Sequence, residues 1–243
     1  MIRLPFLDPL HPQAFPPVDA ALDEPDGLLA AGGDLSAERL LAAYRRGIFP
    51  WFSEGEPILW WSPAQRTVFD TARIHVARRL ARWLRACDWS IHADTAFPEV
   101  MRACATTRRR GHGTWITDDM LAAYARLHEL GHAHSVEVRD AEGRLAGGIY
   151  GVALGRMFCG ESMFSASTNG SKVALLALCR ALETWGSPLL DAQVASDHLF
   201  TLGAREMPRR EFCAQVAALA AQPGRVGPWT RDFPVAAAAD LVS

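Results

Sequence analysis

Three strands predicted in succession near the middle of the chain constrain the fold most. Residues 134–140, 144–153 and 156–161 are short, largely apolar stretches separated by a few residues each, which is typical of strands. Helical patterns precede and follow this run instead of alternating with its strands. The sequence therefore favours α+β layering over a regular βαβ array.

The remaining segments complete this picture. Further strands are predicted at 67–70, 89–93, 188–194 and 204–207. Helices are predicted at 37–46, 73–86, 95–107, 117–130, 171–185, 196–202 and 209–221. The chain has 243 residues, enough to bury a large core. Residues 51–66 are rich in Pro and Gly and are interpreted as a hinge, so we expect a small N-terminal domain at 1–66 and a larger domain at 67–243.

Aromatic residues are concentrated just after the first predicted helix. Three tryptophans, Trp51, Trp60 and Trp61, occur in a stretch of eleven residues, and Pro50 and Pro63 flank this stretch. Indole has a large flat face and a single N–H to satisfy, so this group favours a stacking surface whose partner could be a nucleobase. The alternative is a loop whose aromatic side chains fill the core.

One stretch of the chain is basic, although the net charge is only −2. Residues 73–110 contain nine Arg and three acidic residues, and the predicted helix at 73–86 contains no acid. Four arginines occupy one side of that helix: Arg78, Arg79, Arg82 and Arg85. Arginines one turn apart repel each other, so an anionic partner is expected, and phosphate fits the guanidinium fork. The alternative is a solvated surface that binds nothing.

Two motifs match known sites but lack the surroundings that those sites need. His128-Glu129-Leu130-Gly131-His132 has the H-E-x-x-H spacing of zinc proteases, but Gly131 is expected to end the helix before the second histidine. Arg108-Arg109-Arg110-Gly111-His112-Gly113 resembles the pyrophosphate-binding loop of acetyl-CoA-dependent acetyltransferases, which needs a preceding strand and a following helix. A helical pattern precedes it here. Neither zinc hydrolysis nor coenzyme A binding is expected.

Two polar residues interrupt the otherwise apolar strand at 188–194. Asp191 and Gln193 are two residues apart, so both side chains are expected on one face of the strand. Burying these two side chains costs free energy unless they form hydrogen bonds with other groups of the protein or with a ligand. A functional site is favoured over a self-satisfied structural network, and both interpretations stay open. Glu161, beside Gly160 in another apolar stretch, is a second candidate.

The sequence contains no sign of export, membrane insertion or structural metal. No apolar run is long enough to span a bilayer, and the first residues show no signal-peptide pattern. Five widely spaced cysteines without a C-x-x-C pair fit reduced thiols better than disulfides or zinc. A cytoplasmic protein is expected.

Eight blocks of sequence resemble those of one bacterial enzyme family. The blocks are Asp26–Ala30, Gly32–Ser36, Tyr44–Phe52, Ile58–Pro63, Gly113–Thr117, His128–Ser135, Gly160–Ser165 and the Asp191-x-Gln193-Val194 strand. They occur in the family's order, and several are long and contain rare residues. On these blocks the chain resembles the leucyl/phenylalanyl-tRNA–protein transferases.

This resemblance implies a fold and a reaction. The fold is a small N-terminal domain followed by a larger acetyltransferase-like domain with a central mixed sheet flanked by helices. The reaction moves leucine or phenylalanine from its tRNA to the N-terminal Arg or Lys of an acceptor protein, which marks that protein for degradation. The aminoacyl ester is already activated, so the resemblance implies no ATP, metal, bound cofactor or membrane.

The resemblance also implies roles for individual residues. Positions that bind the aminoacyl-adenosine end of the tRNA are matched by Trp51, Trp115 and Glu161. Positions that line the amino-acid side-chain pocket are matched by Ile149, Phe158, Met163, Leu178 and Leu190. The tRNA acceptor stem would be contacted by Arg78, Arg82 and Arg85. Asp191 and Gln193 would be the catalytic pair, with Asp191 as the basic group and Gln193 orienting the attacking amine, mainly through positioning and electrostatics.

Two other functions remain open on the sequence alone. One is a tRNA-dependent aminoacyl transferase of the type that builds peptidoglycan bridges, and the other is a non-catalytic tRNA-binding protein. Leu178, where an aromatic residue can occur in the family, leaves the preference between Leu and Phe undecided.

Overall fold

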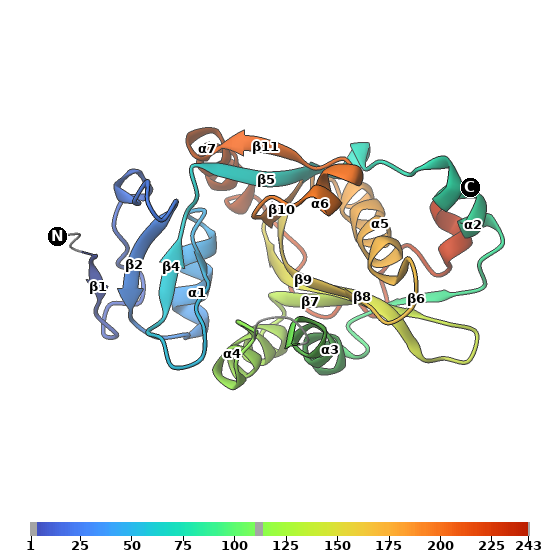
Figure 1. Ribbon diagram of the computed structural model, residues 1–243, viewed down its shortest axis with the longest axis horizontal. Helices are drawn as coiled ribbons and strands as arrows, with labels where there is room; N and C mark the ends of the chain where they lie inside the picture. The colour runs from blue at the N-terminus through green and yellow to red at the C-terminus, as the bar shows by residue number, and fades with distance from the viewer. Residues whose placement is uncertain (1–3, 110–113, 243) are drawn as a thin grey trace.

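The computed structural model describes residues 4–109 and 114–242, which form two β-sheets surrounded by helices (Figure 1). The smaller sheet has the strand order β1-β2-β4-β3. Its strands are β1 (Phe6–Leu7), β2 (Leu28–Gly32), β3 (Phe49–Pro50) and β4 (Leu59–Trp61). The larger sheet has the order β11-β5-β10-β9-β8-β7-β6. The predicted α+β class, with a central mixed sheet flanked by helices, is confirmed, whereas the smaller N-terminal sheet was not predicted.

The larger sheet places one short strand in a sheltered position. Its strands are β5 (Gln65–Asp70), β6 (Ser90–Ala93), β7 (Ala133–Arg139), β8 (Leu145–Leu154), β9 (Met157–Ser165), β10 (Leu189–Gln193) and β11 (Arg205–Pro208). β10 pairs in parallel with β9 and antiparallel with β5. A parallel pair needs a crossover connection, which α5 (Gly170–Thr184) provides. The end of β10 is therefore held on both edges.

Helices cover both faces of the larger sheet. The other helices are α1 (Ala37–Tyr44), α2 (Arg78–Arg85), α3 (Phe97–Arg109), α4 (Asp118–Glu129), α6 (Asp197–Thr201) and α7 (Arg209–Ala220). α5 lies on one face, and α3 and α4 lie on the other (Figure 1). α1 also contacts α4, so the smaller sheet packs against the larger one through these two helices. Two clusters of buried apolar side chains result.

The helix predicted at 73–86 is shorter than expected. Thr71–Arg73 form a separate 3-10 turn, and the α-helix begins only at Arg78. Between them Ile74 and Ala77 adopt extended backbone conformations. The β-branched residues Ile74 and Val76 lose side-chain freedom in a helix, which explains why the segment stays extended despite its apolar spacing.

Part of the segment 51–66, which was interpreted as a hinge, is paired in the smaller sheet. It contains β4, which pairs with β2 and β3. Trp60 on β4 is fully buried, donates its indole N–H to the Gly32 carbonyl at 2.9 Å and meets the Phe15 ring edge-on. The interpretation of Trp60 as part of a stacking surface is therefore wrong, because this residue fills the core. The division of the chain into domains at residue 66 stays a prediction.

Candidate active site

A cavity of about 420 Å³ lies where β9 and β10 approach the segment that follows β3. Two indoles border it, Trp51 and Trp115, and Trp51 is 44% exposed. Its apolar lining includes Phe69, Ile149, Met163, Leu175 and Leu199, and its polar lining includes Glu161, Ser162, Gln193, Ser196 and His198. A mostly apolar lining with a few convergent polar groups is typical of a site for a small ligand.

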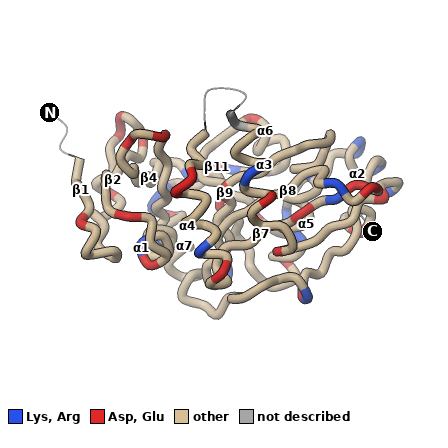
Figure 2. Tube along the Cα trace, turned by 90° about the horizontal axis from the view of Figure 1, so that it is seen from below, with Lys and Arg blue, Asp and Glu red and all other residues tan. Residues whose placement is uncertain are grey.

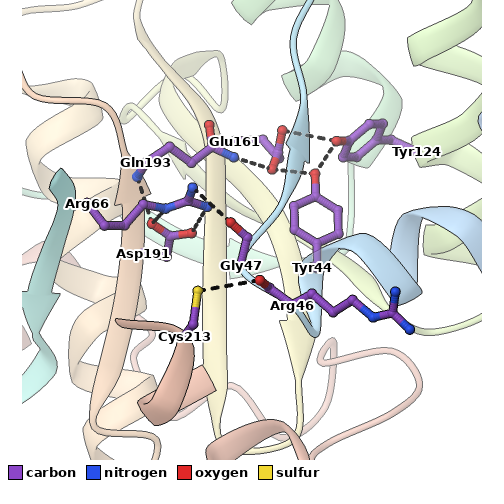
Figure 3. Close-up of polar contacts among 9 residues, drawn as sticks. All are labelled: Tyr44, Arg46, Gly47, Arg66, Tyr124, Glu161, Asp191, Gln193 and Cys213. Carbon is purple, nitrogen blue, oxygen red and sulfur yellow. Dashed lines mark hydrogen bonds and ion pairs between the residues drawn. The ribbon is translucent and has the colours of Figure 1, made fainter. Parts of the chain in front are cut away.

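Glu161 is the centre of a buried hydrogen-bond network at this cavity (Figure 3). Tyr44 Oη and Gln193 Nε2 donate to Glu161 Oε1 at 2.6 and 2.8 Å, and Tyr124 Oη donates to Oε2 at 3.1 Å. The two tyrosine hydroxyls are also close to each other, and because each carries a single proton, one of them bonds to the other only when it does not donate to Glu161. The partners shown here are neutral donors, so they stabilise a carboxylate without neutralising it.

Burial controls the protonation of this network. It raises the pKa of Glu161 to about 7, although the hydrogen bonds from Tyr44 and Tyr124 act in the opposite direction. Burial also raises the pKa of both tyrosines well above the ordinary value, so their hydroxyls keep their protons. Glu161 is thus a group that can gain or lose a proton near neutral pH, which is the property required of a general base.

Asp191 is close to this network but does not line the cavity. It is fully buried, and Arg66 donates to both of its carboxylate oxygens, from Nε at 2.8 Å and Nη2 at 2.7 Å. Burial alone would lower the pKa of the Arg66 guanidinium, but the charge of Asp191 outweighs it and the pKa is raised. Asp191 therefore belongs to a closed ion pair behind the cavity wall.

A β-bulge separates the two members of the predicted catalytic pair. The pairing of β10 with β5 shifts register between Asp191 and Gln193, and Gln193 has a φ of 62°. The Gln193 N–H donates to Asp191 Oδ1 at 2.8 Å, which ties the bulge to the ion pair. Gln193 points to Glu161 while Asp191 faces Arg66, as Figure 3 shows. The expectation that both side chains open onto one face is not met.

The predicted pocket residues fall into two groups. Ile149 and Met163 line the cavity. The other three, Phe158, Leu178 and Leu190, do not line it and are almost completely buried in one of the two apolar clusters. These three side chains therefore belong to the apolar core, whereas α5 and β5 supply lining residues that sequence reasoning did not select, Leu175 and Phe69.

The predicted tRNA-binding arginines lie away from the cavity lining, on α2. Figure 2 shows basic residues gathered along α2, at the end of the molecule near the C-terminus. Leu80 and Leu84 are buried, whereas four arginines are exposed: Arg78, Arg79, Arg82 and Arg85. Within the part of the chain that the structure describes, none of the four forms an ion pair with an acidic side chain. Their charge is available to a partner.

The H-E-x-x-H motif does not form a metal site. α4 ends at Glu129, and Gly131 adopts a φ of 77°, so His132 lies beyond the helix. His128 stacks on the Phe97 ring with the ring centroids 4.3 Å apart. Over residues 4–109 and 114–242, no three His, Cys, Asp or Glu side chains gather as ligands for a metal ion.

Two further observations concern the remaining sequence motifs. The coenzyme A-like motif at 108–113 lies largely outside the described residues, which resume at 114. Among the described helices, none is both long enough and apolar enough to cross a lipid bilayer.

Sequence reasoning missed three residues of the site: Tyr44, Tyr124 and Arg66. Tyr44 and Tyr124 occupy apolar positions of α1 and α4, where a buried tyrosine cannot be told from a packing residue. Arg66 did leave a signal, because the three residues that follow it in its strand, Thr67, Val68 and Phe69, carry no charge. A charged residue in such a strand needs a buried counter-ion, and Asp191 is the acid of another apolar strand.

Comparison with known proteins identifies the family. The family model for leucyl/phenylalanyl-tRNA protein transferase matches residues 68–217, and the model for its N-terminal domain matches residues 33–64. The chain belongs to this family. A leucyl/phenylalanyl-tRNA–protein transferase of Xanthomonas campestris pv. campestris (strain B100) is 57% identical over 93% of this chain and 90% of the relative. One from Xylella fastidiosa (strain M23) is 54% identical over 97% of each.

Among solved structures, the likeness is partial. FemX has a TM-score of 0.45 and 11% identity, covering 71% of this chain and 66% of FemX. A putative acetyl transferase from Pyrococcus furiosus has a TM-score of 0.35 and 11% identity, covering 47% of this chain and 89% of that protein.

Proposed function

We propose that this protein transfers leucine or phenylalanine from an aminoacyl-tRNA to the N-terminal Arg or Lys of an acceptor protein. Membership of the transferase family over most of the chain supports this function. The observation that carries it is the cavity, which joins two indoles, an apolar wall and the Glu161 network in one space. These are the surfaces that an aminoacyl-adenosine needs: a stacking partner, an apolar pocket and a polar group beside the ester.

Two parts of the cavity would recognise the two parts of the aminoacyl-adenosine. Trp51 and Trp115 would stack on the adenine, an interaction worth about 1–3 kcal/mol per base. The apolar wall that includes Ile149, Met163 and Leu175 would accept the side chain of Leu or Phe. An apolar wall separates similar side chains by only about 10–200-fold per methylene, which suits an enzyme that accepts both amino acids.

The exposed arginines of α2 would bind the rest of the tRNA. Guanidinium groups match phosphate oxygens, and their contacts with the backbone do not depend on base sequence. Arg78, Arg82 and Arg85 would therefore contribute affinity for every tRNA. Selection for leucine or phenylalanine would come from the cavity, which binds the aminoacyl end.

The polar side of the cavity would carry out the transfer. The α-amine of the acceptor attacks the ester carbonyl, and the peptide bond forms as the bond between the carbonyl carbon and the ribose oxygen breaks. The proton lost by the amine is passed on to that oxygen, which leaves as the ribose hydroxyl of the tRNA. The amine must lose a proton during this step. Glu161 lines the cavity and has a pKa of about 7, so we propose it as the proton acceptor, with Gln193 orienting the amine. Asp191 would act through position, since Arg66 occupies both of its oxygens.

A transfer assay tests the proposed function directly. Radiolabelled leucyl-tRNA is incubated with the protein and with model acceptors that differ only in an N-terminal Arg, Lys or Ala. Label should enter the Arg and Lys acceptors, and RNase treatment of the tRNA beforehand should prevent it. Equal labelling of the Ala acceptor, or transfer to a muropeptide in place of a peptide that begins with Arg, would contradict the proposal.

A further inference from the structure

Arg66 connects the two sides of the cavity although it does not line it. It is about 1% exposed and holds Asp191 at the end of β10 through two hydrogen bonds. On the other side, its Nη1 donates to the Gly47 carbonyl at 3.3 Å, just before β3. Residues of β3 and Trp51, immediately after it, line the cavity. One side chain thus joins the strand of Gln193 to the segment of Trp51.

Aromatic rings fix the orientation of this guanidinium. Its Cζ lies 4.5 Å from the centroid of the Phe49 ring and 4.7 Å from that of Phe212. A planar guanidinium can stack on rings and donate in a fork at the same time, whereas a lysine ammonium can do neither as well. Arg66 is therefore held in one position by contacts with β3, β10 and α7.

The bulge at the end of β10 depends on this arrangement. Gln193 adopts a left-handed conformation that is unfavourable for a residue with a side chain, and such conformations persist only where their surroundings enforce them. The hydrogen bond from the Gln193 N–H to Asp191 Oδ1 is such a restraint, and Arg66 donates from Nε to the same oxygen atom. Figure 3 shows this chain of contacts from Arg66 through Asp191 to Gln193 and Glu161.

We propose that Arg66 is a positioning residue for the transfer reaction. Through Asp191 it holds the bulge that aims the Gln193 amide at Glu161, and through Gly47 and Phe49 it holds the Trp51 segment opposite. Arg66 acts on no reacting atom itself. The role of Arg66 in turnover rests on the proposed function, whereas the placement of Gln193 can be measured without any substrate.

Arg39 offers a matched control within the same chain. It is also fully buried, donates from Nε to Asp34 at 3.2 Å and from Nη2 to the Asp8 carbonyl at 2.7 Å. Neither partner lines the cavity. Arg39→Lys therefore disturbs a buried arginine and its acid without disturbing the Gln193 bulge.

The test compares Arg66→Lys with Arg39→Lys by two readouts. The first is the NMR signal of the Gln193 side-chain amide in the ¹⁵N-labelled protein, assigned by its loss in Gln193→Ala. The second is the rate of leucine transfer at saturating substrates, per folded molecule. Arg66→Lys should shift or broaden the amide signal and lower kcat by about ten-fold or more, because residues that act as a unit fail together. Arg39→Lys should change neither.

A double-mutant cycle separates positioning from general destabilisation. If Arg66 acts through Gln193, then Arg66→Lys should reduce kcat little further in the Gln193→Ala background, whereas an unrelated structural effect should add in full. If Arg66→Lys does not fold, the paired change Arg66→Met with Asp191→Leu replaces it, because removing both charges of a buried pair is tolerated far better than removing one. The paired variant should show the same shifted amide signal and the same loss of kcat.

Specific results would overturn the inference. A wild-type amide signal in the folded Arg66 variant would show that Arg66 does not position Gln193. An unchanged kcat, or additive effects in the cycle, would show that Arg66 does not serve the transfer reaction through Gln193. Absence of leucine transfer by the wild-type protein would instead refute the proposed function. In that case the amide signal still decides whether Arg66 places Gln193.

Discussion

Two buried acidic residues, one that lines the cavity and one that does not, differ in the groups that donate hydrogen bonds to them. In front, Glu161 accepts hydrogen bonds from Tyr44, Tyr124 and Gln193. Behind, Asp191 is paired with a cation. Both acids are buried, and neighbouring strands hold them, so burial alone does not distinguish a chemical group from a structural one. The two acids differ in the charge of their partners, because Glu161 has neutral donors whereas Asp191 is paired with the Arg66 cation.

The apolar residues show the same separation. Met163 is partly exposed and lines the cavity, whereas Leu178 is completely buried in an apolar cluster and does not line it. Changes behind the wall should therefore affect the free energy of unfolding, and changes in front of it should affect protonation and substrate choice. Four predictions test this separation.

The largest effect is expected for Asp191→Asn. The change leaves the Arg66 charge buried without a counter-ion, which costs about 3–5 kcal/mol of unfolding free energy. Urea unfolding followed by far-UV circular dichroism measures this loss. Glu129→Gln is the control, because Glu129 pairs with Arg126 and both of these side chains are exposed. An equal loss in the two variants would contradict the distinction drawn for Asp191.

Leu178→Ala should reduce the free energy of unfolding by about 2–5 kcal/mol, because it leaves a cavity in a fully packed cluster. The ratio of leucine to phenylalanine transfer should stay at the wild-type value in the folded variant. Competition between the two aminoacyl-tRNAs, assayed below the unfolding temperature, measures this ratio. A changed ratio would place Leu178 in contact with the bound amino acid.

The pH dependence of stability should report Glu161. Its pKa is raised from 4.5 to about 7 by folding, so the folded protein binds this proton more tightly than the unfolded chain does. The resulting stabilisation is complete below pH 4.5 and is lost as the pH rises through about 7, a change of about 3 kcal/mol.

Comparison with Glu161→Gln isolates this contribution. Urea unfolding is measured for both proteins at about pH 5 and about pH 8, on either side of the pKa of about 7. The stability of the wild type relative to the variant should be greater at the lower pH. A difference that does not change with pH would mean that Glu161 has the same pKa in the folded and unfolded chains.

The smallest effect is expected for Met163→Ala. The shorter side chain enlarges the cavity, which should raise the ratio of phenylalanine to leucine transfer by about ten-fold, within the range that such pockets achieve. The unfolding free energy should fall by only about 1 kcal/mol, because the side chain is partly exposed and faces the cavity. The competition assay used for Leu178→Ala measures the transfer ratio, and urea unfolding measures the free energy. An unchanged ratio would remove Met163 from the substrate pocket.

The larger sheet could be predicted from sequence because its elements show strong periodicity. β7, β8 and β9 and the helix α5 lie within a few residues of their predicted ends. The smaller sheet was missed. Its strand β2 has the sequence LLAAG, with no β-branched residue, and β3 is only two residues long and contains Pro50. Such strands form because neighbouring backbone groups pair with them.

The site could be predicted only in part for a related reason. Glu161, Gln193 and the two border indoles were found through motifs and family resemblance. The bulge that separates Gln193 from Asp191 breaks the two-residue alternation on which their common face was predicted. The partners of these residues, Tyr44, Tyr124 and Arg66, come from three other elements. The pattern of residues within one helix or strand does not show which elements far away in the sequence will pack against it.

The Tyr44 hydroxyl reaches Glu161 across 117 residues of sequence, from the helix that belongs to the smaller sheet. A fragment that began at β5 would retain most of the cavity wall but would lose the Tyr44 donor, and Gln193 would then be the remaining donor described for Glu161 Oε1. The N-terminal part of the chain therefore contributes directly to the hydrogen-bond network at the cavity. The cavity therefore forms only when residues as far apart in sequence as Phe49 and Leu199, both of which line it, have come together.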